Sequence, residues 1–261
     1  MPDYFEVDAL NNSFLKIVRD CPAKAKYQMD HGQPQPTDAM LFGSYVHACL
    51  LEPDTVDSRY VVAPEINKRT KAGKEEWAEF LSANEGKGIV TDSDMRKVED
   101  MRQSLLSNNC AVEKLTACEK EVETFWTDAE SGNKCKAKID GLADDFAVDL
   151  KTTADASPRG FSRAIVNYSY HMQAAFYIDG AQRKDFYFIA MEKTPPYVTM
   201  VYQVAWGTLQ LGKRRYREAI ETYDACVKSG IWPGYANGIL KISAPEWAFS
   251  DEVEEEGDVG Y

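Results

Sequence analysis

The chain has 261 residues, 44% of them hydrophobic, and a formal net charge of −12 at pH 7. The length allows one large domain or two small ones, and the hydrophobic content is ordinary for a globular protein. No apolar run reaches the ~20 residues of a transmembrane helix, and the acidic first residues lack the basic and apolar regions of a signal peptide. We therefore expect a cytoplasmic protein without membrane contact, and the net charge argues against one that simply coats DNA.

Two local features of the composition limit the possible structures. Six cysteines are spread singly in mostly apolar surroundings and form no Cys-x-x-Cys pair, which favours reduced thiols over a disulfide framework or a zinc site. The acidic run near the C-terminus predicts a disordered, solubilising tail over 251–261, with docking to a basic partner as the alternative.

The first part of the chain is predicted to be mainly helical. A capped short helix begins at Asn12-Ser13 and stops near Cys21-Pro22, and the glycine and prolines of 31–37 indicate a loop. Apolar residues on most faces predict a buried helix over 39–51, and a strand follows at 59–63. From 68 to 108 the pattern is polar and helical.

The second part of the chain alternates strands with helices. Three strands are expected in succession, and a helix then separates them from two further strands and a long amphipathic helix. The predicted strands are 121–126, 134–140, 146–151, 186–191 and 198–204, and the predicted helices are 158–178 and 206–227.

Two carboxylates and a lysine, Asp140, Asp149 and Lys151, stand out among these strands. Residues two apart in a strand share a face, so Asp149 and Lys151 point together while Leu150 points into a core. A tight turn near Asp144-Asp145 would place Asp140 opposite Asp149, with side chains about 4.5–5.5 Å apart. Two bare carboxylates that close repel each other. A divalent cation removes this conflict, and hard oxygen ligands beside a lysine suit Mg²⁺ and a phosphate substrate.

The segment Asp140…Asp149-Leu150-Lys151 resembles the P-D-(D/E)-x-K nuclease signature, with Ile139 where the first proline usually stands. Gly43-x-x-x-His47 and Gln173-x-x-x-Tyr177 resemble the helices that precede and follow the core strands in RecB-like nucleases. Longer strings occur in the order found in the exonuclease VIII (RecE) nuclease-domain family, and this similarity covers roughly residues 4 to 250. Those strings include Phe42-Gly43-Ser44, Val62-Ala63-Pro64-Glu65, Arg69-Thr70-Lys71-Ala72-Gly73-Lys74 and Tyr170-His171-Met172-Gln173.

This resemblance implies an α/β fold with a restriction-endonuclease-like P-D-(D/E)-x-K core. A central mixed sheet would be flanked by helices and carry a helical insertion at about 65–110. Residues 1–250 would form a single exonuclease domain, and 251–261 would be the acidic tail.

The resemblance also implies the site. His47 could instead be a core histidine whose ring nitrogens are hydrogen-bonded, and Tyr177 could simply pack in the core. Glu123 is the alternative to Glu121, because both are expected on one strand face. The implied cofactor is Mg²⁺, with Mn²⁺ able to substitute. The implied catalytic residues are Asp140, Asp149, Lys151, Glu121, Gln173 and Tyr177, and the implied metal ligands are His47, Asp140, Asp149 and the Leu150 carbonyl.

Two basic segments are candidates for DNA binding. The densest basic run holds Arg69, Lys71 and Lys74, while Arg159 and Arg163 begin the helix after Lys151. Exposed basic loops are usually just solvated, but beside a nuclease site they are candidates for contacts to backbone phosphates.

The implied function is a metal-dependent double-strand DNA exonuclease, acting 5′ to 3′ and leaving 3′ single-stranded tails for phage or prophage recombination in a bacterial host. Its implied partners are linear duplex DNA, a single-strand annealing recombinase and further copies of the chain in a ring. No Gly-x-x-x-x-Gly-Lys-[Ser/Thr] motif occurs, so nothing suggests ATP-driven unwinding. The alternatives are a structure-specific or restriction-type endonuclease with the same core and a catalytically silent recombination-assembly protein.

Overall fold

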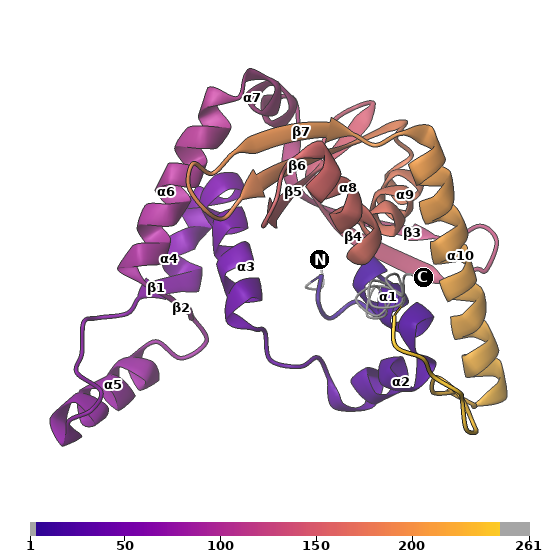
Figure 1. Ribbon diagram of the computed structural model, residues 1–261, viewed down its shortest axis with the longest axis horizontal. Helices are drawn as coiled ribbons and strands as arrows, with labels where there is room; N and C mark the ends of the chain where they lie inside the picture. The colour runs from indigo at the N-terminus through magenta and orange to yellow at the C-terminus, as the bar shows by residue number, and fades with distance from the viewer. Residues whose placement is uncertain (1–3, 246–261) are drawn as a thin grey trace, which may run out of the picture.

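A computed structural model describes residues 4–245 of the chain (Figure 1). Its centre is a five-stranded sheet in the order β3-β4-β5-β6-β7. β5 and β6 are parallel and the other neighbours are antiparallel, which confirms the expected mixed sheet of an α/β fold. The strands are β3 (Glu119–Thr127), β4 (Lys134–Leu142), β5 (Phe146–Thr153), β6 (Asp185–Glu192) and β7 (Thr199–Gln203).

The parallel pairing of β5 with β6 requires a crossover, because only antiparallel strands can be joined by a short turn. The crossover contains α8 (Pro158–Asn167) and α9 (Tyr170–Ala181). The prediction of one helix over 158–178 was wrong, since Ser169 has a φ of 55°. This left-handed conformation interrupts a right-handed helix. The break gives α9 a direction of its own across the sheet.

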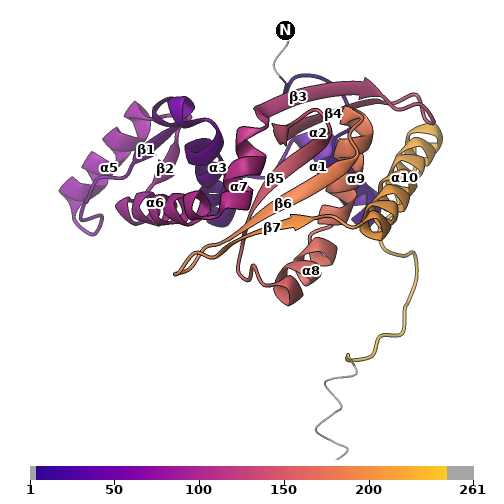
Figure 2. The same ribbon diagram turned by 90° about the horizontal axis from the view of Figure 1, so that it is seen from above.

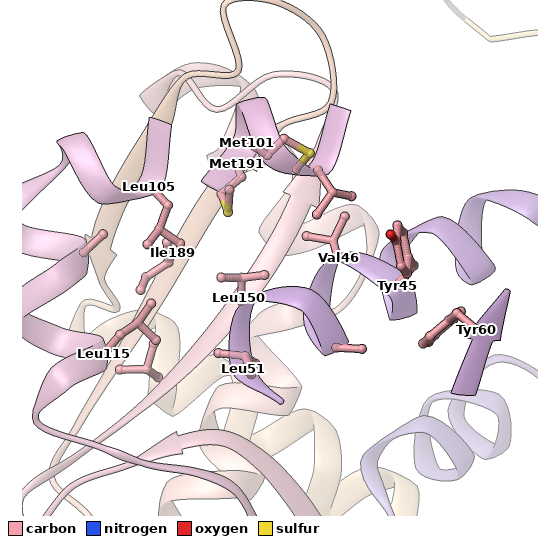
Figure 3. Packing of buried hydrophobic residues seen from close by; sticks show 14 of the residues in the cluster. Tyr45, Val46, Leu51, Tyr60, Met101, Leu105, Leu115, Leu150, Ile189 and Met191 are labelled. Atoms are coloured by element: carbon pink, nitrogen blue, oxygen red, sulfur yellow. The ribbon is translucent and has the colours of Figure 1, made fainter. Parts of the chain in front are cut away.

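One face of the sheet is covered by α3 (Asp38–Leu51), α6 (Asp92–Ser107) and α7 (Asn109–Thr116). Leucine, isoleucine, valine and methionine side chains fill the space between these helices and the sheet. Burying one such side chain stabilises a fold by roughly 1.5–3 kcal/mol, so this layer fixes α3 firmly against β5. Figure 3 shows the side chains that form the layer, which are Val46, Leu51, Met101, Leu105 and Leu115 from the helices and Leu150, Ile189 and Met191 from the strands.

The opposite face is covered by α8 and α9, and α10 (Trp206–Ser229) and α1 (Asn12–Asp20) pack outside α9 (Figure 2). Phe161 and Ala174 contact the sheet layer that includes Phe186 and Phe188. The outer layer joins Leu15, Met172, Phe176, Tyr216 and Ile220. α9 is therefore held between the sheet and a second helical layer.

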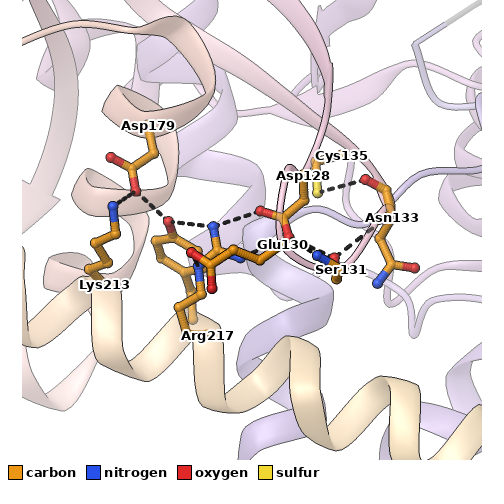
Figure 4. Close-up of polar contacts among 9 residues, drawn as sticks. Asp128, Glu130, Ser131, Asn133, Cys135, Asp179, Lys213 and Arg217 are labelled. Carbon is orange, nitrogen blue, oxygen red and sulfur yellow. Dashed lines mark hydrogen bonds and ion pairs between the residues drawn. The ribbon is translucent and has the colours of Figure 1, made fainter.

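Polar contacts fasten α10 to the turn between β3 and β4 (Figure 4). Arg217 pairs with Asp128, which also accepts hydrogen bonds from Ser131. Burial raises the pKa of Asp128, but the hydrogen bonds from Arg217 and Ser131 outweigh it and lower the pKa to about 2. Lys213 pairs with Asp179 of α9 at 3.0 Å, which ties α10 to α9 as well.

A small lobe extends from the end of α3. The chain passes through η1 (Pro53–Thr55) and α4 (Val56–Arg59) into β1 (Tyr60–Val62), which pairs in parallel with β2 (Gly88–Val90). Between these strands, α5 (Lys71–Ala83) projects away from the main sheet (Figures 1 and 2). The polar pattern over 68–108 is thus two helices separated by β2. Gly86, with a φ of 83°, turns the chain between them.

Helix α1 ends where the sequence predicts, but Pro22 begins a further helix, α2 (Pro22–His31), that was not expected. Proline is well tolerated at the first helical position, because its missing N–H has no partner there. The predicted loop follows over 32–37 and leads into α3.

The remaining predictions concern the cysteines, membrane contact and the tail. All six cysteines are free, and Cys21, Cys135 and Cys226 are buried. Within residues 4–245, no helix combines the length and the apolar composition needed to cross a membrane. The predicted acidic tail at 251–261 lies outside the described residues.

Candidate active site

The candidate site lies where β4 and β5 part. The last paired residues of this ladder are Gly141 and Val148, so Asp140 and Asp149 stand directly beyond it. The backbone N–H of Leu150 donates to Asp140 Oδ2 at 2.7 Å. A side-chain carboxylate thus satisfies a strand N–H, which anchors Asp140 beside β5 after the regular pairing has ended.

Asp149 is held from two sides. Its Oδ2 lies 2.6 Å from the ammonium of Lys151, and its Oδ1 accepts a 2.6 Å hydrogen bond from Gln173 Nε2. The first contact follows from the two-residue spacing in a strand, and the second places α9 over β5. Tyr177, one helical turn beyond Gln173, interacts with the Gln173 side chain. The Lys151 ammonium also lies over the Tyr170 ring, 4.8 Å from its centroid.

A second group forms beside this pair from three further elements. Donor atoms of His47 on α3, Glu121 on β3 and Asp140 on β4 lie within 4.8 Å of one another. His47 Nδ1 is 3.4 Å from Asp140 Oδ2. Glu123, the alternative acid, is exposed to solvent and does not join the group.

The backbone at Glu121 departs from regular strand geometry. Its φ is 53°, a left-handed conformation that is uncommon for a residue other than glycine. Such positions cost free energy and persist where surrounding structure determines them, often at functional sites. The β3–β4 register continues unchanged on both sides of Glu121, so the departure is confined to this residue.

The charges at the site perturb one another. Burial and then the nearby charge of Asp149 raise the pKa of Asp140, against the opposing effects of His47 and Lys151. Burial lowers the pKa of Lys151, but Asp149 and Asp140 outweigh it and raise the pKa overall. The pKa of Tyr177 lies well above its usual value because of burial and the same two carboxylates. The site therefore holds an excess of negative charge in a buried position.

The donor set fits a small divalent cation. Carboxylate oxygens with one imidazole nitrogen suit Mg²⁺ or Mn²⁺. Asp149 Oδ2 is buried and, apart from its ion pair with Lys151, receives no hydrogen bond within residues 4–245. It therefore has lone pairs free for a metal ion. Asp140 also accepts the N–H of Leu150, the residue whose carbonyl is the last expected ligand.

The predicted DNA-binding residues lie in two separate places. Arg69, Lys71 and Lys74 are exposed on the projecting lobe, at and before the start of α5. Arg159 and Arg163 are exposed on α8, and Arg163 lines a groove of about 450 Å³ next to the end of β5. The groove is also lined by Met40, Thr152, Tyr168, Tyr170 and Lys193.

Lys16 is a basic residue near the site that the sequence does not reveal. Burial and the charge of Lys151 lower its pKa, while Asp149 raises it, which places its ammonium within electrostatic reach of both. It donates to the Tyr168 carbonyl at 3.3 Å and lines a second groove, of about 700 Å³, between α1 and α2. Lys16 precedes Asp149 by more than a hundred residues, so only the fold brings the two together.

The mixed sheet and the paired carboxylates with their lysine define a P-D-(D/E)-x-K-type fold. The chain belongs to the family described as a PDDEXK-like domain of unknown function (DUF3799), whose model matches residues 11–243. This confirms the family resemblance predicted from the sequence. The chain matches none of the curated proteins.

Solved structures were also compared with this fold, and the first of those below supports it. A presumed exonuclease from Eubacterium rectale is 16% identical and covers 93% of each chain, with a TM-score of 0.64. The second structure is LHK-Exo, an alkaline exonuclease of Laribacter hongkongensis, in complex with dAMP. It is 12% identical, and the alignment covers 87% of this chain and 96% of LHK-Exo with a TM-score of 0.39. A phage-related exonuclease from Haemophilus somnus is 12% identical and covers 64% and 91%, with a TM-score of 0.34. At 16% identity the likeness to the Eubacterium rectale protein extends to the fold alone, and nothing is drawn from the two structures with TM-scores below 0.5.

Proposed function

We propose that this chain is a divalent-metal-dependent nuclease that digests linear double-stranded DNA. The observation that carries the proposal is the convergence of His47, Glu121 and Asp140 beside the Asp149–Lys151 pair, at the point where β4 and β5 part. Burying carboxylates this close together is costly to the fold, because like charges repel and lose their hydration. A site that binds a cation and a phosphodiester gives this arrangement a chemical purpose.

The side chains divide the chemistry among them. His47, Glu121, Asp140, Asp149 and the Leu150 carbonyl would hold Mg²⁺, which when bound would supply Lewis-acid chemistry to the scissile phosphate and to an attacking water. Lys151 orients that water and offsets charge that develops on the phosphate. Gln173 fixes the orientation of Asp149, and Tyr177 supports Gln173 from the next turn of α9. Hydrolysis is direct, without a covalent enzyme intermediate.

DNA binding is assigned to the basic side chains around the site. Arg163 and Lys193 line the groove beside β5. Lys16 donates a hydrogen bond to the carbonyl of Tyr168, which also lines this groove. Arg159 extends this surface along α8. Arg69, Lys71 and Lys74 would contact phosphates farther along the duplex, because they lie on the projecting lobe. Such contacts fix the position of DNA without reading its sequence.

Finer features of the proposal rest on the resemblance to the RecE family. Digestion runs 5′ to 3′ and leaves 3′ single-stranded tails for a single-strand annealing recombinase in a phage-type pathway, in the cytoplasm of a bacterial host. With a net charge of −12, a lone subunit is a poor electrostatic match for DNA. A ring of several subunits would gather the basic segments around one channel.

Digestion of matched linear and covalently closed circular duplexes, each end labelled separately, tests this function. Wild-type protein with Mg²⁺ should degrade only the linear form, starting from the labelled 5′ end, and EDTA should stop it. Asp144→Asn removes an exposed carboxylate from the β4–β5 turn. It is the matched control for substitutions of the active-site aspartates and should behave as wild type. Cutting of the circle would instead support an endonuclease, and the absence of metal-dependent hydrolysis a silent assembly protein.

A further inference from the structure

We propose that Lys138 is a built-in counter-cation that competes with a divalent ion for Glu121 and so sets the metal affinity of the site. The proposal rests on the proposed function, because it takes the site to bind metal. Lys138 is a positioning residue in this account, since it acts through Glu121.

The contact that carries the inference is an ion pair inside the ligand group. Lys138 Nζ lies 2.8 Å from Glu121 Oε2, and Glu121 is one of the three side chains whose donor atoms converge. The Glu121 and Lys138 side chains are 13% and 29% exposed, so water screens the pair only partly. An ammonium at this position therefore partly neutralises a carboxylate that a metal ion would use.

A second carboxylate gives Lys138 an alternative partner. Glu52, at the end of α3, has its Oε2 3.6 Å from Lys138 Nζ and 2.9 Å from Arg59 Nη1. Lys138 thus lies between Glu121 and Glu52, and Arg59 fixes Glu52 in place. A small shift of the flexible lysine would release Glu121 to a metal ion without leaving the ammonium unpaired. The chain Arg59–Glu52–Lys138–Glu121 links the start of the small lobe to the candidate metal site.

Electrostatics gives the direction of each substitution. Lys138→Met keeps most of the apolar stem and removes the competing charge, so a divalent ion should bind about 3- to 10-fold more tightly. Glu52→Gln removes the alternative partner, leaves Lys138 on Glu121 and should weaken metal binding by about 2- to 5-fold. Lys138→Arg keeps the charge and should restore near-wild-type affinity.

Calorimetric titration of the DNA-free protein with Mn²⁺ tests the proposal, with thermal melting of each metal-free variant as a folding check. Lys134→Met is the matched control, because it removes the same charge from an exposed position at the far end of β4 and should leave the affinity unchanged. Tighter binding by Lys138→Met and weaker binding by Glu52→Gln would support the proposal.

Two negative results have different meanings. Equal affinities in wild type, Lys138→Met and Glu52→Gln would overturn the role of Lys138 while leaving the proposed function standing. A wild type that binds no Mn²⁺ would overturn both. Should Lys138→Met not fold, Lys138→Gln and Glu52→Gln carry the same test, because each changes the competing charge or its alternative partner.

Discussion

The neighbourhood of Asp149 and the lobe around α5 hold their charges in opposite ways. Asp149 is 2% exposed and its two oxygens contact Lys151 and Gln173, each at 2.6 Å. Lys71 and Lys74 at the start of α5 are exposed, and the ion pair of Lys71 with Glu75 is long, at 3.9 Å. Buried, mutually perturbed charges are typical of chemistry, whereas exposed ones are typical of loose contacts with a polyanion. The comparison predicts effects of very different size in the two regions.

The largest effect is expected for Asp149→Asn. The substitution keeps the size of the side chain but removes a charged ligand and the partner of Lys151, so DNA hydrolysis should fall by about 1,000-fold or more. Circular dichroism and thermal melting should show a folded protein, because a carboxylate next to Asp140 has been neutralised. Hydrolysis within tenfold of wild type would show that the chemistry lies elsewhere.

Removing a supporting hydrogen bond should cost less. Gln173→Leu deletes the donor to Asp149 Oδ1, and removal of such an orienting group typically costs 10- to 100-fold in activity or metal affinity. Steady-state digestion rates at several Mg²⁺ concentrations measure it. Gln103→Leu, at an exposed position on α6, is the control. Equal rates for the two variants would argue that Gln173 only packs.

Without bound metal, the protein should become less stable as the pH rises. Burial and the Asp149 charge raise the pKa of Asp140 to about 7, above the ~3.9 of a free aspartate. A raised carboxyl pKa gives stability that is full below pH ~4 and is lost as the pH rises through 7. Urea denaturation in EDTA should show a loss of on the order of 1 kcal/mol or more in the free energy of unfolding.

Asp140→Asn isolates this contribution, because its side-chain oxygen can still accept the Leu150 N–H. The difference in stability between the variant and wild type should grow with pH in EDTA and shrink when Mg²⁺ is added. A constant difference across the range would contradict the buried, perturbed carboxyl.

The smallest effect is expected on the lobe. Replacing Arg69, Lys71 and Lys74 together with alanine should weaken duplex binding by about 3- to 10-fold. The salt dependence of binding should become shallower by up to ~0.9 for each DNA phosphate that the variant no longer neutralises. The digestion rate at saturating DNA and the melting temperature should not change. Binding titrations at several salt concentrations measure the affinity and its salt dependence, with Glu76→Gln and Glu79→Gln as exposed controls on the same helix. An unchanged salt slope would remove the lobe from the DNA path.

Local periodicity predicts much of this molecule. Strand alternation places Asp149 and Lys151 on one face, and helical spacing places Gln173 and Tyr177 together on α9. The five strands of the main sheet and α1, α3 and α10 also follow from the apolar pattern. These features depend on residues close together in the chain, so the sequence records them directly.

Other features depend on tertiary structure or on single backbone angles. Glu121 and Ser169 adopt left-handed conformations. Glutamate and serine rarely do so, and nothing in the sequence marks these two positions, so the break between α8 and α9 was missed. Lys16 approaches Asp149 only through the packing of α1 on α9 and α10. Lys138 could have been noticed, because it lies two residues before Asp140 on a predicted strand.

The most direct test of the proposed site is an anomalous diffraction map from crystals soaked in Mn²⁺. We predict a peak within about 2.5 Å of the carboxylates of Asp140 and Asp149 and next to His47, with loss of that peak in Asp140→Asn crystals. A well-diffracting crystal with no peak at these side chains, or with its only ordered Mn²⁺ elsewhere, would contradict the assignment of a metal-dependent nuclease site.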